Sequence, residues 1–394
     1  MELIPQILLN LRNNILYRIL IMIARQLKPQ IEAQLGSGKA IILLGARQVG
    51  KSTLIHTIFD NRDDVLWLNG DDSDVQRIFS EMTTDRLRLF IGNKKYIVVD
   101  EAQRISNIGM RLKLITDQIK GVQVIATGSS SLQLAAGVGE SLTGRKREFK
   151  MYPLSFKEMV DNTDALKETR SIPHRMIYGY YPEVVSLPGE EKEVLRELSS
   201  SYLYKDILQL DGIGRPDKLV LLVQALARQI GDQIAYREIG QLIGLDSKTV
   251  EKYIDILEKN FIVFRLGSFS RNLRNELKYS KKIYFYDLGI RNAVINDYRE
   301  AENREDTGAL WENFFIVEKL KQNNYSRSFA NMWFWRTTRQ KEIDLIEEKD
   351  DAITAFEAKW NPAKKAFVPP HFAQSYPDAA FHIVTPENAI EYLI

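Results

Sequence analysis

A glycine-rich stretch carries the clearest chemistry in the sequence. Residues 45–53 read Gly-Ala-Arg-Gln-Val-Gly-Lys-Ser-Thr, which matches the pattern G-x-x-x-x-G-K-[ST]. Four apolar residues precede it and an apolar-periodic segment follows, so the loop is predicted between a buried strand and a helix. Glycines let the backbone curl so that successive N–H groups point inward at phosphate oxygens, and the helix adds the positive end of its dipole. The pattern predicts a site for the phosphates of a nucleotide.

Each part of this loop has an expected role. Lys51 is expected to reach the terminal phosphates, and the hydroxyl of Ser52 is expected to be a ligand of Mg²⁺. The residues expected to bind the nucleotide are Gly45, Ala46, Arg47, Gln48, Val49, Gly50, Lys51, Ser52 and Thr53. An ordinary glycine turn is the alternative, but the complete pattern between strand and helix favours a phosphate site.

A later strand ends in two carboxylates. Residues 95–101 read Lys-Tyr-Ile-Val-Val-Asp-Glu, and ligands of parallel sheets bind at the carboxyl ends of the strands. Asp100 is expected to hold Mg²⁺ through its water shell, and Glu101 to orient and deprotonate the attacking water. Alone, this pattern also suits a solvated strand end; behind a complete phosphate loop the functional interpretation is favoured.

Hydroxyl and basic residues follow in the same part of the chain. The apolar strand at 122–127 leads to Thr127 and then Ser129, the first and second candidates for a residue that senses the terminal phosphate. Capping of the next helix is the alternative. Arg145 precedes the next strand and could serve as an arginine finger, supplied in trans if copies assemble into rings. A solvated basic loop explains that segment equally well.

Composition excludes several classes of site. The 394 residues suggest two to four domains, and 54 basic against 52 acidic residues give a net charge of +2, which says nothing about nucleic acid. The absence of cysteine excludes a disulfide framework and thiolate metal sites, and fits a reducing interior. The four histidines show no ligand spacing, so no zinc site is expected.

The N-terminal apolar run does not suggest a membrane span. Residues 15–24 are interrupted by Arg18, are fewer than the roughly 20 that a span requires, and are followed by no convincing cleavage site. We interpret the run as an amphipathic helix of a cytoplasmic protein that contacts no membrane. Met22 is an alternative translation start.

Five short segments together resemble a known family. They read Gly-Ala-Arg-Gln-Val-Gly-Lys-Ser, Val-Val-Asp-Glu-Ala-Gln, Ala-Thr-Gly-Ser-Ser-Ser, Leu-Thr-Gly-Arg and Tyr-Pro-Leu-Ser-Phe-Lys-Glu. From Arg25 onward the chain resembles the AAA-type P-loop ATPases of bacteria and archaea that carry a C-terminal domain of uncharacterised function. The resemblance implies ATP as ligand, Mg²⁺ as cofactor and ATP hydrolysis, and it leaves a homo-oligomer open.

Residues 234–266 read as helix, turn, helix and strand, which is the pattern of a winged helix. Ile239 and Leu242 are expected to face inward, and Asp246 or Ser247 to cap the second helix. That helix mixes lysines with acids, which suits a major-groove reader poorly. The segment 265–282 is strongly basic, and the residues expected to contact DNA phosphates are Arg271, Arg274, Lys278, Lys281 and Lys282. A packing module with a solvated basic loop is the alternative.

Acids and a lysine recur at strand spacing near the C-terminus. A helix over 309–322 contains Glu312, and two later strands contain Glu342 with Asp344 and Glu357 with Lys359. Residues two apart in a strand share a face. This order resembles the PD-(D/E)xK nuclease fold of restriction enzymes and Holliday-junction resolvases. The resemblance implies that Asp344, Glu357 and Glu312 bind Mg²⁺ and that Lys359 activates the water or steadies the phosphate.

Alternating strands and helices predict a parallel, doubly wound α/β sheet. We expect an N-terminal helical segment (1–34), an AAA-type ATPase core (35–160), a helical lid (161–220), a winged helix (221–296) and a nuclease-like domain (297–394). Two functions compete. One is an ATPase that acts on DNA, with a tail that cuts or clamps it; the other is a signalling or assembly ATPase whose C-terminal domains bind protein partners.

Overall fold

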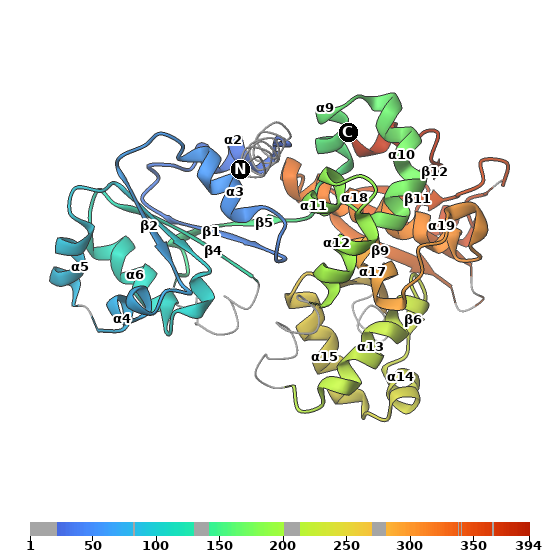
Figure 1. Ribbon diagram of the computed structural model, residues 1–394. Coiled ribbons are helices and arrows are strands. Elements are labelled where there is room, and N and C mark those ends of the chain that lie inside the picture. Colours follow the sequence, from blue (N-terminus) through green and yellow to red (C-terminus); the bar gives the residue numbers. More distant parts are fainter. Residues whose placement is uncertain are drawn as a thin grey trace, which may run out of the picture.

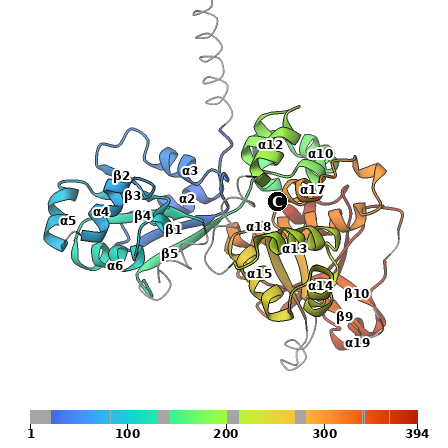
Figure 2. The same ribbon diagram turned by 60° about the horizontal axis from the view of Figure 1, so that its bottom comes forward.

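The computed structural model describes residues 22–81, 83–129, 142–200, 213–269, 281–337, 339, 341–364 and 366–394. The chain forms two parts that lie side by side (Figure 1). We call residues 22–151 the N-terminal half and residues 152–394 the C-terminal half. A view turned by 60° shows the same separation, with one sheet in each half (Figure 2).

The N-terminal half is built on a parallel five-stranded sheet. Its strands are β1 (Ala40–Gly45), β2 (Val65–Asn69), β3 (Tyr96–Asp100), β4 (Gln123–Gly128) and β5 (Lys146–Met151), in the order β2-β3-β4-β1-β5. Strand β1, which lies between β4 and β5, is buried along its whole length, which explains its unbroken apolar sequence. The predicted parallel α/β sheet is confirmed.

Helix α2 precedes the first strand, and further helices lie between the strands along the chain. They are α2 (Leu27–Glu32), α3 (Lys51–Ile58), α4 (Ser73–Glu81), α5 (Thr84–Ile91), the 3₁₀ turn η1 (Ala102–Arg104) and α6 (Ile108–Gln118). Because all five strands run in one direction, the segments that follow β1, β3 and β4 meet at one edge of the sheet.

The segment predicted as a helical lid packs mainly within the C-terminal half. Helix α9 (Phe156–Asn162) leads into this segment, and the helices within it are α10 (Ala165–Tyr178), α11 (Pro182–Ser186) and α12 (Glu191–Leu198). Helices α10 and α12 pack on α17 (Leu288–Ile295), where Asn292 donates to the carbonyls of Met176 and Ile177 at 3.0 and 2.8 Å.

A helix–turn–helix follows. Its elements are α13 (Pro216–Arg228), β6 (Gln233–Ile234), α14 (Tyr236–Ile243) and α15 (Ser247–Lys259), followed by β7 (Val263–Ser268) and β8 (Lys281–Phe285). Gly244 ends α14 with φ +73°, and Asp246 caps α15 by accepting from the N–H groups of Lys248 and Thr249. The predicted inward position of Leu242 is wrong: it is 71% exposed, and Ile243 is buried in its place.

The remaining elements complete a seven-stranded sheet. They are η3 (Ala301–Asn303), α18 (Thr307–Ser326), β9 (Asn331–Arg336), β10 (Glu342–Lys349), β11 (Ala352–Ala358), α19 (Pro370–Ser375), β12 (Ala380–Val384) and α20 (Ile390–Leu393). The strand order is β12-β11-β10-β9-β7-β8-β6. Strand β7 pairs with β9 in parallel. The expected boundary at residue 297 therefore divides strands of a single sheet.

Candidate functional site

The phosphate loop connects β1 to α3 at the carboxyl edge of the first sheet. Two of its glycines are required by the backbone: a Cβ on Gly45 would lie 2.2 Å from the carbonyl oxygen of Met151, and Gly50 has φ +92°. The side chain of Lys51 is folded back into the loop, where its Nζ donates to the carbonyls of Gly45 and Ala46 at 3.0 and 2.7 Å. The loop is thus preformed.

Lys51 is 5% exposed, and its environment perturbs its charge. Burial lowers the pKa of the ammonium to about 8, although the nearby carboxylates of Glu101 and Asp100 favour the charged form. The charge of Lys51 is therefore held weakly, and a polyanionic ligand in the loop would stabilise it.

Three predicted residues meet beside this lysine. The hydroxyl of Ser52 donates to Asp100 Oδ2 at 2.7 Å, and the hydroxyl of the fully buried Thr127 donates to Asp100 Oδ1. Asp100 is therefore fixed from two sides by the ends of α3 and β4. Ser129 follows β4 at the same edge. The Thr127 hydroxyl contacts the carboxylate and does not point to open space.

Glu101 has an unusual backbone. Its φ is +48°, which a non-glycine residue adopts at a cost of about 1–3 kcal/mol and which is found preferentially at functional sites. Gln103 donates a hydrogen bond to Glu101 Oε2, and its own Oε1 is buried without a hydrogen-bond partner among the described residues.

Two residues that support this edge were missed by the sequence interpretation. A Cβ on Gly70 would lie 2.3 Å from the Glu101 carbonyl oxygen, so only glycine lets the end of β2 approach here. The buried guanidinium of Arg25 donates to the Val49 carbonyl of the phosphate loop at 2.7 Å, to the Tyr152 carbonyl at 2.6 Å and to Glu158 at 3.1 Å. No motif marks either position.

A cavity of about 310 Å³ adjoins the phosphate loop at Val49 and Gly50. It lies between the segment before α2, the first turns of α3 and helix α11. The side chains that line it are mostly apolar or neutral: Met22, Ile23, Ala24, Thr53, Leu54, Thr57, Leu154, Pro182 and Ser186, with Arg25 and Lys28. Its place and lining suit a flat heterocyclic base next to bound phosphates.

Arg145 lies at the opposite edge of the sheet. Strands β1 and β5 are parallel with Ala40 beside Lys146 and Gly45 beside Met151. At about 3.3 Å per residue, Arg145 is roughly 20 Å from the phosphate loop of its own chain. Its Nε donates to Asp117 at 2.6 Å. Arg145 therefore does not join the other predicted residues within one molecule.

A second cluster of predicted residues lies in the C-terminal half. Carboxylate oxygens of Glu312 on α18 and of Glu342 and Asp344 on β10 all lie within 4.8 Å of one another. Glu342 was expected on the same face as Asp344 but not as part of a cation site. Such a group of hard oxygen donors is chemically suited to Mg²⁺.

The remaining predicted pair, Glu357 on β11 and Lys359 directly after this strand, borders the cluster. Lys359 Nζ lies 2.6 Å from Glu357 Oε1, and the N–H of Ala358 donates to Asp344 Oδ2 at 2.8 Å. Burial raises the pKa of Asp344 well above its usual value, and the negative charges of Glu312 and Glu357 add to the effect. Burial likewise raises the pKa of Glu357, against the attraction of Lys359.

The structure corrects the prediction that Lys282 contacts DNA phosphates. Lys282 is 2% exposed, its Nζ lies 2.9 Å from Glu312 Oε1, and it also contacts Glu342. A local count of basic residues overlooks such pairing with distant acids. Lys281 is exposed, whereas Arg271, Arg274 and Lys278 lie outside the described residues.

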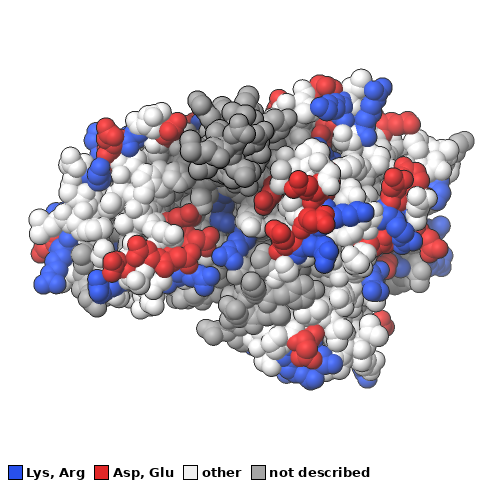
Figure 3. All heavy atoms as spheres, in the orientation of Figure 1, with Lys and Arg blue, Asp and Glu red and all other residues white. Residues whose placement is uncertain are grey.

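Helix α15 presents a more basic surface than its sequence indicates, because two of its acidic residues are paired with a residue of another element. Arg265 of β7 pairs with two of its acids, Asp255 and Glu258. Lys248, Lys252 and Lys259 remain exposed, and their spacing of four and seven residues places them on one side of the helix. Over the face drawn in Figure 3, acidic and basic side chains are otherwise intermingled.

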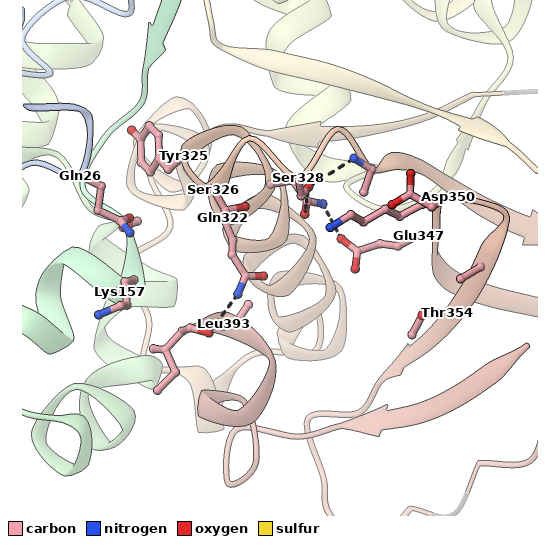
Figure 4. Close-up of a pocket in the computed structure, with 16 residues that line it drawn as sticks. Gln26, Lys157, Gln322, Tyr325, Ser326, Ser328, Glu347, Asp350, Thr354 and Leu393 are labelled. Atoms are coloured by element: carbon pink, nitrogen blue, oxygen red, sulfur yellow. Dashed lines mark hydrogen bonds between the residues drawn. The ribbon is translucent and has the colours of Figure 1, made fainter. Parts of the chain in front are cut away.

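Another cavity, of about 650 Å³, lies between the start of α9, the end of α18 and strands β10 and β11. Figure 4 shows Tyr325 and Gln26 at one end of it and Glu347 at the other. Its polar side chains satisfy one another: Asn323 donates to Glu347 at 2.5 Å and accepts from Ser328 at 2.7 Å. None of the residues that line it is a predicted site residue.

Comparisons with known proteins assign the N-terminal half. Residues 37–160 match a family described as an AAA domain, so the predicted AAA-type P-loop core is confirmed. Residues 169–300 and 307–392 match two families, each described as a domain of unknown function (DUF8612 and DUF4143).

The similar proteins are distant. An uncharacterised protein of Methanocaldococcus jannaschii is 24% identical over 345 residues, which cover 82% of this chain and 75% of the relative. An uncharacterised protein of Haemophilus influenzae is 25% identical over 340 residues, with 79% and 80% covered.

Solved structures resemble the chain only loosely. The Walker-type ATPase PABY2304 of Pyrococcus abyssi has a TM-score of 0.47 at 14% identity, covering 68% of this chain and 94% of its own. The Aeropyrum pernix ORC1 protein, solved in complex with DNA, has a TM-score of 0.38 at 14% identity, covering 70% and 93%. Likeness at this level carries no functional conclusion.

A search of the described helices found none long and apolar enough to cross a membrane.

Proposed function

We propose that the protein binds ATP with Mg²⁺ at the phosphate loop and hydrolyses it. The observation that carries the proposal is the hydrogen-bonded group of Ser52, Asp100 and Thr127 beside the buried Lys51. Ser52 and Asp100 supply the hard oxygen atoms that would hold Mg²⁺, which would neutralise charge on the phosphate oxygens. In this proposal the adenine base of ATP occupies the cavity bordered by Thr53 and Pro182.

Glu101 is the general base in this proposal. It follows Asp100 at the edge where the terminal phosphate would lie, and Gln103 holds its carboxylate. Thr127 positions Asp100, and Ser129 is the second candidate for a hydroxyl that senses the phosphate. Lys51→Ala is expected to lose nucleotide binding, measured with a fluorescent ATP analogue; unchanged binding would contradict the proposed site.

Arg145 acts in trans in this proposal. Because Arg145 lies roughly 20 Å from its own loop, a role as an arginine finger requires a neighbouring copy; a solvated arginine paired with Asp117 is the alternative. With an arginine finger in trans, the protein would hydrolyse ATP as a homo-oligomer.

We further propose that the tail is a PD-(D/E)xK nuclease-like domain. Its order is α18, β9, β10, β11, α19 and β12, with β9, β10 and β11 antiparallel and β12 parallel to β11. Glu312, Asp344 and Glu357 would hold Mg²⁺, joined by Glu342. Lys359 would steady a phosphate or orient water, because its ammonium is held beside that group by Glu357.

Nucleic acid is the favoured partner of the C-terminal half, which we interpret as including a winged helix. The exposed lysines of α15 and Lys281 support phosphate contacts, and Arg271, Arg274 and Lys278 extend this proposal. The second candidate function is an assembly or signalling ATPase with protein partners. This function is favoured because Lys282 and Arg265 are each paired with acidic residues of the same chain, which leaves two fewer basic residues to contact DNA.

One experiment separates these functions. The full chain with Mg²⁺ and ATP is mixed with linear, single-stranded or branched DNA and compared with Lys359→Ala and with Lys248→Glu/Lys252→Glu. Cleavage that Lys359→Ala loses would support a nuclease. A gel shift that only the double variant loses would support DNA binding without cutting. No shift with any DNA would favour the protein-partner function.

A further inference from the structure

Lys282 stands out because its charge is buried in a group of acids from other elements. It lies on β8, whereas Glu312 lies on α18 and Glu342 and Asp344 on β10; strands β9 and β7 separate β10 from β8. Its ammonium lies 2.9 Å from Glu312 and in contact with Glu342. Tyr284 of the same strand donates to Glu312 at 2.6 Å.

The ammonium group of Lys282 occupies a position between two of these carboxylates, those of Glu312 and Glu342. An ammonium group and a divalent metal ion compete for the same carboxylate oxygens, because both take them as ligands.

The charge of the cluster leaves room for a second cation. Four carboxylates (Glu312, Glu342, Asp344 and Glu357) carry four negative charges when ionised. Lys282, Lys359 and Arg336, whose guanidinium lies 3.3 Å from Glu342, carry three positive ones, so one negative charge is left over. Lys359 is committed to Glu357, so Lys282 is the ammonium that contacts two members of the group of three acids.

We propose that Lys282 is a built-in competitor that a divalent metal ion must displace from Glu312 and Glu342. The inference rests on the proposed metal site of the tail. Lys282 belongs to β8, which pairs with β7 and β6, so the strands that carry the helix–turn–helix also supply the competing ammonium group.

The test is calorimetric titration of Mn²⁺ into the full chain without nucleotide. Lys282→Met removes the charge and keeps a long side chain, and it is expected to bind Mn²⁺ at least tenfold more tightly than the unchanged protein. Lys349→Met is the control, since Lys349 is exposed at the end of β10, the strand that carries Glu342 and Asp344; it should not alter binding. Asp344→Asn should abolish the binding and so identifies the site.

A second variant guards against loss of folding. Lys282→Gln removes the charge but retains a donor for Glu312, and its expected gain in affinity is also tenfold or more. Circular dichroism checks that each variant is folded. Equal Mn²⁺ affinity in the unchanged protein and both folded variants would overturn the role of Lys282 and leave the metal site standing. Absence of Mn²⁺ binding in all of them would overturn the proposed metal site and the inference together.

Discussion

The buried guanidinium of Arg25 gives the sharpest prediction about how the two halves are joined. It connects the Val49 carbonyl of the phosphate loop to the Tyr152 carbonyl and to Glu158, whose side chain is completely buried. The Tyr325 hydroxyl of α18 accepts from the N–H of Tyr152 at 3.0 Å, so the C-terminal half meets the same group. Arg25→Met removes the charge while it keeps most of the apolar stem.

The expected loss of stability follows from the ion pair that Glu158 loses in Arg25→Met. Removal of one partner from a buried ion pair costs about 3–5 kcal/mol, because the other charge is left uncompensated. Glu158 keeps two backbone donors, the N–H groups of Gln26 and Ser155 at 2.9 and 3.0 Å. We therefore expect a loss near the lower end, about 3 kcal/mol in the free energy of unfolding.

A double variant tests the cause. Glu158→Gln removes the charge and keeps the side chain's shape, but it retains one of the two oxygens that accept from the N–H groups of Gln26 and Ser155. Combined with Arg25→Met it should recover part of the loss, so that the double variant is more stable than Arg25→Met alone. Urea unfolding followed by circular dichroism measures all three, with the denaturant slope checked for a constant value.

The matched control is Lys28→Met. Lys28 lies on α2, and its pair with Glu32 is 4.0 Å long and about 40% exposed at both ends. Exposed pairs of this kind contribute about 0–1 kcal/mol, so the control should be nearly neutral. A loss below about 1 kcal/mol in Arg25→Met, or no recovery in the double variant, would refute the view that a buried ion pair braces the loop.

The remaining predictions concern the phosphate site. The pKa of Lys51 is lowered to about 8, and bound phosphates would raise it. ATP affinity should therefore be highest below pH 8 and should fall as the pH rises above 8. Calorimetry at pH 8.5 should detect the uptake of protons when ATP binds. Gly70→Ala should destabilise the fold and slow hydrolysis, because the new Cβ would collide with the Glu101 carbonyl oxygen. Unchanged turnover would mean that the backbone can shift to accept the Cβ without disturbing Glu101. Arg145→Glu should leave ATP affinity unchanged but reduce turnover at least tenfold at concentrations where the protein is oligomeric; full turnover by the variant assembly would exclude an arginine finger.

The phosphate site could be predicted from sequence because its parts are contiguous or end adjacent strands. Gly45 to Thr53 form one loop, and a parallel sheet brings the ends of β1, β3 and β4 together without further information. Arg25 could not be found this way. Its partners are 24 to 133 residues away, and a single arginine before a helix has no characteristic pattern.

The C-terminal half shows where prediction from the sequence fails. The resemblance to the nuclease fold led us to expect Asp344 near Glu312, and the structure brings them together. The basic segment at 265–282, in contrast, was counted as one surface. Lys282 is instead paired with acids 30 and 60 residues further along the chain, and Arg265 with α15. A count of basic residues in a segment describes its surface charge only when the acids that pair with them lie in the same segment. Here β7 pairs with β9 in a shared sheet, which the sequence does not reveal.

ATP turnover by Glu101→Gln tests the central claim most directly. The unchanged protein and the variant are compared for binding of a fluorescent ATP analogue and for steady-state release of phosphate. We predict equal affinity, because Lys51 and the loop are intact, and turnover reduced by about 10²–10⁴-fold, because the general base is lost. Normal turnover by Glu101→Gln would contradict the proposed base, and absence of turnover in the unchanged protein at any oligomeric state would contradict an ATPase.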